Sequence, residues 1–243
     1  MNSNVDALID ALPRLWDGMV VTIILTLGGA ALAMILAVVL GLASTNRHAY
    51  VRVPARVVVE FFRGTSLLVQ LFWLFYVLPL LGYQLDPTFC GILALGLNYG
   101  AYGAEVVRGA IAAVPRPQSE AAVALNFTPW QRMHRVVFPQ AWAQMIPPLT
   151  NLLIQLMKGS ALASFILLQD LTYQIEQLRR GTGDTIFSFG VGLILYFVFA
   201  YILTLIMNLL EVRAKSRLGV GPSMKDVLRV RPEKVDESVG VGR

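Results

Sequence analysis

The sequence has few charged residues and almost no cysteine or histidine. Only 14% of its 243 residues are Asp, Glu, Lys or Arg, and its mean hydropathy is +0.63, values that exclude an ordinary soluble domain. The single cysteine, Cys90, excludes a disulfide framework. The two histidines, His48 and His134, are far apart in the chain, so the sequence offers no candidate metal pair.

A nucleotide-binding motif is also missing. The phosphate-loop pattern G-x-x-x-x-G-K-[ST] does not occur, and no group of residues forms a candidate catalytic constellation. We therefore expect a protein that is not an enzyme, that holds no cofactor, and that takes any ATP energy from a partner. The formal net charge of +5 does not indicate nucleic-acid binding, because most of the charge flanks apolar runs.

Long apolar runs dominate what is present. Runs of about 20 or more apolar residues are long enough to cross a hydrocarbon core of roughly 30 Å as helices. The sequence therefore predicts an all-α, polytopic membrane protein with five spans, at residues 18–43, 57–80, 88–107, 148–169 and 185–210.

The two ends differ in composition from the spans. Acidic residues precede the first apolar run and no basic region leads it, so residues 1–17 do not read as a cleavable signal. Residues 5–17 predict either a short interfacial helix or a loosely ordered leader. Residues 212–243 are charged, and we expect a disordered cytoplasmic tail attracted to anionic lipid by the basic cluster at 213–217.

Basic residues are concentrated in alternate loops, which predicts the orientation of the chain. Arginine and lysine are the residues that cytoplasmic loops retain. One set of loops, together with the C-terminal tail, holds most of the basic residues, which places the N-terminus outside and the C-terminus in the cytoplasm of a bacterial cell. These residues are Arg47, Arg52, Arg56, Arg116, Arg132, Arg135, Arg213, Lys215 and Arg217.

The polar insert at 114–139 predicts two short helices joined by a tight turn. The first helix is expected over 119–125 with Ser119 as its N-cap. The second opens at Thr128, which is followed by proline and, three residues on, by Gln131 in a capping-box pattern. Between them, Asn126 is the residue best suited, after glycine, to a left-handed turn.

This insert resembles the EAA loop of ABC importer permeases. The resemblance rests on Glu120-Ala121-Ala122, a turn residue six positions after the glutamate, and an apolar run that ends at Pro139. Asn126 stands where the family has glycine. Further stretches are similar to the polar amino acid (His/Glu/Gln/Arg/opine) uptake permeases, namely those at 62–70, 101–109, 136–141 and 158–164.

The resemblance implies a permease subunit that works as a homodimer or heterodimer with two copies of a separate ATPase and an extracytoplasmic solute-binding protein. ATP and Mg would bind the ATPase. The insert at 119–139 would seat in a groove of that ATPase; the implied coupling residues are Glu120, Ala121, Ala122, Asn126 and Pro139. The alternative interpretation of the insert is an amphipathic helix that lies on the lipid surface.

Several polar residues inside the spans are candidates for the translocation path. Lys158 lies about 15 Å beyond Pro148, near the middle of the bilayer. Its functional interpretation is contact with a carboxylate of the substrate or of a gate. Its structural interpretation is an ion pair with an internal acid such as Glu105 or Glu60. Arg63 and Glu60 are three residues apart, and the sequence favours a local ion pair. The candidate set is Lys158, Ser160, Arg63, Thr65, Asn98, Glu105 and Gln155.

Two other functions remain as alternatives. A secondary transporter would show repeated halves and ionisable residues in several spans, and the sequence has no clear inverted repeat. A structural subunit of a membrane complex would transport nothing. For the favoured importer, the transported solute could be a polar amino acid, an opine or a compatible solute such as ectoine.

Overall fold

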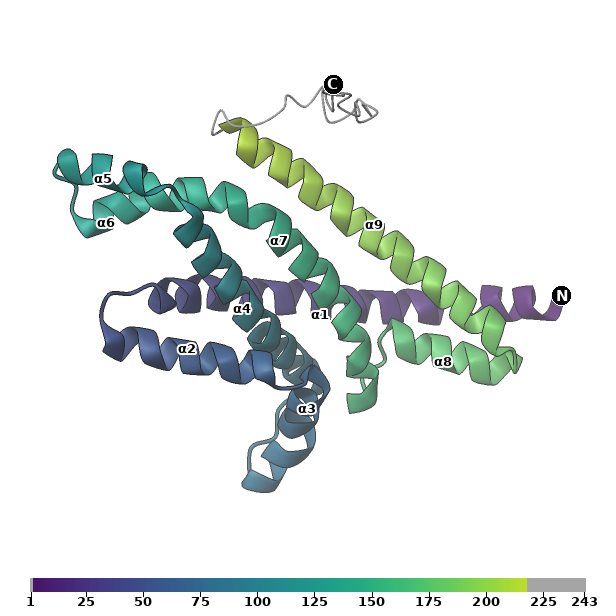
Figure 1. The fold of residues 1–243 in the computed structure, drawn as a ribbon. Helices are drawn as coiled ribbons and strands as arrows, with labels where there is room; N and C mark the ends of the chain where they lie inside the picture. The colour runs from purple at the N-terminus through teal and green to yellow at the C-terminus, as the bar shows by residue number, and fades with distance from the viewer. Residues whose placement is uncertain (1, 218–243) are drawn as a thin grey trace, which may run out of the picture.

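The computed structural model describes residues 2–217, within which every regular element is helical (Figure 1). This confirms the predicted all-α class. The α-helices are α1 (Asn2–Ser44), α2 (Ala49–Gly64), α3 (Leu67–Phe72), α4 (Pro87–Ala113), α5 (Arg116–Ala124), α6 (Pro129–Arg132), α7 (Phe138–Gly159), α8 (Leu171–Thr182) and α9 (Thr185–Arg217). Short π-helical turns occupy Trp73–Val77 and Met133–Val137, and 3₁₀ turns occupy Leu78–Leu81 and Ser160–Ile166.

The centre of the bundle is the crossing of α1 and α4, the most extensive helix pair in the described chain. Small residues let the two backbones approach closely, as in other helix pairs in lipid. A Cβ added at Gly96 would lie 2.5 Å from the Leu32 side chain, and one at Gly41 would lie 2.9 Å from the Ala104 carbonyl oxygen. The crossing therefore depends on glycine at both positions.

Three helical runs within the described residues are long and apolar enough to cross a membrane: Asn4–Ser44, Pro129–Ile166 and Thr185–Arg213. The bent pair Ala49–Gly64 and Leu67–Leu81 makes a fourth if it counts as one span. The expected third span, 88–107, lies within α4, which is not among these runs. Protein rather than lipid surrounds much of α4, since many of its residues are buried, so it needs no continuous apolar surface.

The observed helix bounds differ from the expected spans: α2 begins at Ala49 rather than 57, and α7 begins at Phe138 rather than 148. Three further differences concern the architecture. Residues 5–17 do not form a separate helix or a loose leader, because α1 runs without a break from Asn2; its Ala11 and Leu15 pack on α8. The second span is not straight but bends by 100° after Gly64. Residues 170–184, which the expected spans leave as a connection, mostly form helix α8.

The two ends of the molecule differ (Figure 1). Helices α5 and α6 project at the end where α1 connects to α2, whereas the N-terminus and α8 lie at the opposite end. Among the described residues, helix α9 packs mainly on α7 and α8. It runs on to Arg217, beyond the expected start of the tail at 212, and residues 218–243 of that tail lie outside the described residues.

Candidate functional site

The polar insert forms a helical hairpin of α5 and α6, as the sequence predicts. Helix α5 begins at Arg116, three residues before the expected start, with Pro117 in its first turn. Proline suits this position because the first turn leaves its N–H groups unbonded. Ser119 consequently lies inside α5, and the prediction that it caps the helix is wrong.

The turn of the hairpin has the predicted left-handed residue. Asn126 has a φ of +58°. The Phe127 N–H donates to the Ala122 carbonyl at 3.0 Å, and the Asn126 N–H donates to the Val123 carbonyl at 2.9 Å. This pair of bonds is the Schellman pattern, which satisfies carbonyls that the end of α5 would otherwise leave free.

The second helix of the hairpin starts with the predicted capping box. The Gln131 N–H donates to Thr128 Oγ1 at 3.3 Å, and the Thr128 N–H donates to Gln131 Oε1 at 3.0 Å. From α6 the chain passes through the π-helical turn Met133–Val137 into α7 without a break. The π turn immediately precedes the first turn of α7, where Pro139 has no N–H to donate to the preceding turn. The hairpin is thus the end of a long membrane helix.

Exposure divides the hairpin residues into two groups. Ala122 is only 3% exposed, on a helix that packs against the Met133–Val137 turn, whereas Glu120 and Ala121 are exposed. Three large apolar side chains of the hairpin also face outward, at 52% to 74% exposure: Val123, Leu125 and Trp130. The hairpin therefore presents an apolar surface, and Ala122 supports its interior.

The bend in the second span is held by side chains of α4 and α3. The Phe62 carbonyl accepts from Asn98 Nδ2 and from Gln70 Nε2, both at 3.0 Å. The Arg63 carbonyl accepts from the Tyr102 hydroxyl at 3.3 Å. Both carbonyls belong to the last turn of α2, whose acceptors have no partner in the helix itself. The bend is therefore a fixed feature of the fold.

Two predicted path residues serve this bend. Asn98 is 4% exposed, and its amide bonds the Phe62 carbonyl rather than lining an open cavity. Thr65 Oγ1 donates to the Phe61 carbonyl at 2.9 Å and accepts from Gln70 Nε2 at 2.7 Å.

The acidic candidates are already paired. Arg63 contacts Glu60 at 2.9 Å, which confirms the local ion pair, and Arg108 contacts Glu105 at 2.7 Å. The proposed structural partnership of Lys158 with Glu60 or Glu105 is therefore wrong. Lys158 is exposed and forms no ion pair within residues 2–217.

Ser160 lies away from any open surface. It is fully buried, and its hydroxyl donates to the Met157 carbonyl at 2.7 Å. Gln155 has an exposed side chain, while its backbone carbonyl accepts from the Tyr99 hydroxyl at 2.9 Å.

The exposed residues of α7 are all polar. The apolar side chains of α7 are buried or partly buried. The residues that remain exposed fall at spacings of seven, four and three, which places them on one face; they are Gln144, Asn151, Gln155 and Lys158. We call this set the α7 polar stripe. Sequence reasoning missed Gln144 and Asn151, although their helical spacing from Lys158 was a usable signal.

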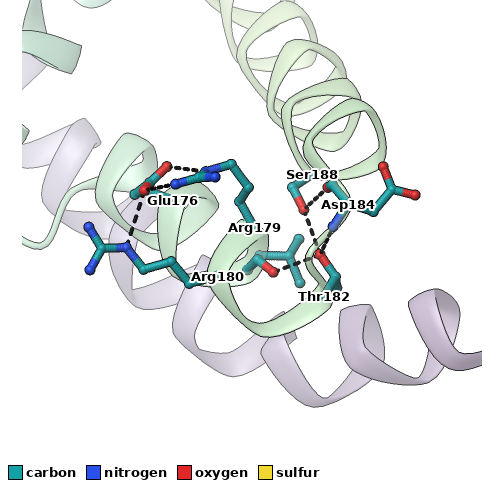
Figure 2. Close-up of polar contacts among 7 residues, drawn as sticks. Glu176, Arg179, Arg180, Thr182, Asp184 and Ser188 are labelled. Atoms are coloured by element: carbon teal, nitrogen blue, oxygen red, sulfur yellow. Dashed lines mark hydrogen bonds and ion pairs between the residues drawn. The ribbon is translucent and has the colours of Figure 1, made fainter.

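Helix α8 carries a second polar cluster that the sequence left in a loop (Figure 2). Glu176 pairs with Arg179 at 2.6 Å and with Arg180 at 3.2 Å. Hydrogen bonds from Arg179, and then from Arg180, lower the pKa of the Glu176 carboxyl to about 2, so it is ionised at neutral pH. The cluster keeps a net charge of +1 from its two arginines, and its one acid is already paired, so it offers no free carboxylate for a substrate amine.

Asp170 caps the N-terminus of α8. Its Oδ1 accepts from the Tyr173 N–H at 3.0 Å, while Oδ2 is buried without a partner. Burial raises the pKa of this carboxyl to about 6, although the bond from the Tyr173 N–H acts the other way. Asp170 therefore belongs to the packing of α8 rather than to an open site.

These features define a helical membrane protein whose polar hairpin continues into a membrane span that has one polar face. The chain belongs to the family described as the binding-protein-dependent transport system inner membrane component, which matches residues 29–216.

Two curated relatives agree with this assignment. The chain is 43% identical over 208 residues to the probable amino-acid ABC transporter permease protein y4tF of Sinorhizobium fredii, covering 83% of this chain and 87% of the relative. It is 36% identical over 202 residues to the L-cystine transport system permease protein TcyB of Bacillus subtilis, covering 83% and 86% of the two chains.

A solved structure has the same fold. A chain of an amino acid ABC transporter crystallised with histidines superposes with a TM-score of 0.79 at 30% identity, covering 85% of this chain and 96% of that one. The protein is therefore a multi-pass inner-membrane permease subunit of an ABC importer rather than an enzyme. Its transport system includes an ATPase on a separate subunit and a binding protein.

Proposed function

We propose that this permease carries a polar amino acid or a similar zwitterionic solute into the cell. It works as one of two permease subunits with two copies of the ATPase, which bind ATP and Mg. The names of its relatives, which refer to amino acids and to L-cystine, support the substrate class. The proposal of a translocation path rests on the α7 polar stripe.

A polar face cannot remain against lipid. Amide and ammonium groups in hydrocarbon cost several kcal/mol unless they meet water or polar partners. The stripe runs from Gln144 to Lys158, or about 21 Å at 1.5 Å per residue. With Lys158 near the middle of the bilayer, this distance covers the half of the membrane on the hairpin side, headgroup region included. The stripe therefore lines a water-filled path, which is completed by the second permease subunit.

Lys158 is the residue of the stripe that attracts a substrate carboxylate. It is the only charged member, and no acid of the described chain neutralises it. Gln155 is one turn away on the same face. Five other candidates act on the path indirectly, because each has a side chain bonded within the bend of the second span or to a neighbouring group; they are Arg63, Thr65, Asn98, Glu105 and Ser160.

The hairpin couples the path to the ATPase. Its exposed residues, among them Glu120, Ala121 and Leu125, seat in a groove of the ATPase. Asn126 fixes the turn and Ala122 packs inside it. Closure of the ATPase dimer moves the hairpin as a rigid body. Because α6 continues past Pro139 into α7, the same movement reaches the polar stripe.

The proposed orientation places the hairpin in the cytoplasm and the N-terminus outside. The basic α1–α2 connection lies at the hairpin end of the molecule, and the N-terminus lies at the other end (Figure 1). This distribution fits the excess of arginine and lysine in cytoplasmic loops.

Co-purification of the ATPase tests the docking. Leu125→Asp replaces a 69% exposed apolar side chain of the hairpin by a charge. Burial of a leucine is worth roughly 1.5–3 kcal/mol, so we expect at least about tenfold weaker binding of the ATPase. Leu80→Asp is the matched control, since Leu80 is 83% exposed but lies outside the hairpin. Equal recovery of ATPase with both variants would contradict the proposal.

A further inference from the structure

A groove runs between α1, α7 and α9, with α4 also lining its smaller part, on the side of α7 away from the polar stripe. It consists of two adjoining cavities of about 420 and 130 Å³, and both are lined by Met34, Leu149 and Met207. In a helix, residues 142, 149 and 156 lie roughly opposite 144, 151 and 158. The groove and the proposed path therefore occupy opposite sides of one helix.

The groove has the composition of an amphiphile site. Its walls are almost wholly apolar, and at one end lie Trp142 and Arg213. Tryptophan side chains favour the boundary between headgroups and hydrocarbon. An arginine presents five N–H donors in a planar fork that matches a phosphate, so it can bind one while it keeps another contact.

The length of the groove matches one leaflet. On α7 its lining extends from Trp142 to Leu156, fourteen residues or about 21 Å. Half of a bilayer of 40–45 Å, headgroups included, is about 20–22 Å. An acyl chain whose headgroup is held at Arg213 would therefore end near the middle of the membrane, at the far end of the groove.

We propose that the groove holds an anionic phospholipid. Its phosphate binds Arg213 and its acyl chain lies against Met34, Leu149 and Met207. The assignment to the cytoplasmic leaflet rests on the proposed orientation. A second permease copy is not the occupant, because the polar stripe faces that copy from the opposite side of α7. The lipid fills the space beside the cytoplasmic half of α9, a helix that packs on little else than α7 and α8.

Lipid retention tests this site independently of transport. The permease–ATPase complex is purified from nanodiscs that contain equal amounts of phosphatidylglycerol and phosphatidylcholine, and retained lipid is measured by native mass spectrometry. We expect wild type to retain phosphatidylglycerol preferentially. Arg213→Gln reduces that retention by about tenfold, the effect of losing a charge-assisted pair. Arg56→Gln, another exposed arginine at a distance from the groove, leaves it unchanged.

Two further variants separate a lost site from a misfolded protein. Arg213→Lys keeps the charge and retains part of the preference, and Leu149→Trp fills the groove and reduces retention of both lipids. Equal retention of the two lipids by wild type, or an unchanged preference in Arg213→Gln, overturns the proposal. So does cross-linking of two copies through Met207→Cys in a Cys90→Ser background, because the groove is then a protein interface. A complex with no transport that still shows the preference leaves the lipid site standing.

Discussion

Asn126 offers a quantitative test of the hairpin. Its φ of +58° is a conformation that costs an L-amino acid roughly 1–2 kcal/mol and that asparagine, with its short polar side chain, tolerates better than most residues. Asn126→Val introduces a β-branched side chain into this conformation. The hydrogen bonds from the amides of residues 126 and 127 to Val123 and Ala122 must open when the turn is lost.

The predicted effect follows from that backbone cost. A loss of about 1–2 kcal/mol in the closed turn raises the open fraction about 5- to 30-fold. Hydrogen exchange of the Phe127 amide, measured by mass spectrometry on the purified complex, should accelerate by this factor. In Asn126→Gly this exchange rate should remain within about threefold of wild type. Glycine removes the energetic cost of the left-handed conformation, but it raises the entropy of the open chain by a similar amount.

The Gly183 amide is an internal reference, since it bonds the Arg179 carbonyl at 2.9 Å at the end of α8. Its exchange should be the same in all three proteins. An unchanged Phe127 amide in Asn126→Val would refute the view that the left-handed residue maintains the turn.

Three other predictions concern sites outside the hairpin. The pKa of Asp170 is raised from 3.8 to about 6 in the folded protein. The stability that this carboxyl contributes is therefore complete below pH 4 and is lost as pH rises through 6, by about 3 kcal/mol in all. Thermal unfolding of Asp170→Asn should lack this pH dependence. Leu167 is a bulky exposed residue with φ +65°. Its replacement by glycine should raise the free energy of unfolding of the protein by about 0.5–1 kcal/mol, which would appear as a higher melting temperature. Lys158→Met should lower transport without loss of assembly, and Lys158→Arg should preserve part of it; unchanged affinity and rate in Lys158→Met would remove this lysine from the path.

Local signals made the hairpin predictable from the sequence. The capping box at Thr128 and the left-handed turn at Asn126 each depend on residues within four positions, and both are present in the structure. The start of α5 was misplaced because Pro117 suits a first turn as well as Ser119 suits a cap.

The remaining errors involve contacts between distant residues. Asn98 reads as a cavity residue until its partner is known, and that partner is the Phe62 carbonyl, 36 positions away. Helix α8 reads as a loop because its buried residues, Leu171, Ile175 and Leu178, need α1 to cover them. A hydropathy pattern does not reveal which surface will meet lipid and which will meet another helix.

Reconstituted transport is the most direct measurement of the central claim, that this chain forms the membrane path of an ATP-driven amino acid importer. Proteoliposomes would contain this chain, its ATPase and, on the appropriate side, its binding protein. The account predicts uptake of a polar amino acid that requires both ATP and the binding protein. Leu125→Asp should abolish this uptake, whereas Leu80→Asp should not. Uptake driven by an ion gradient in the absence of the ATPase would contradict it.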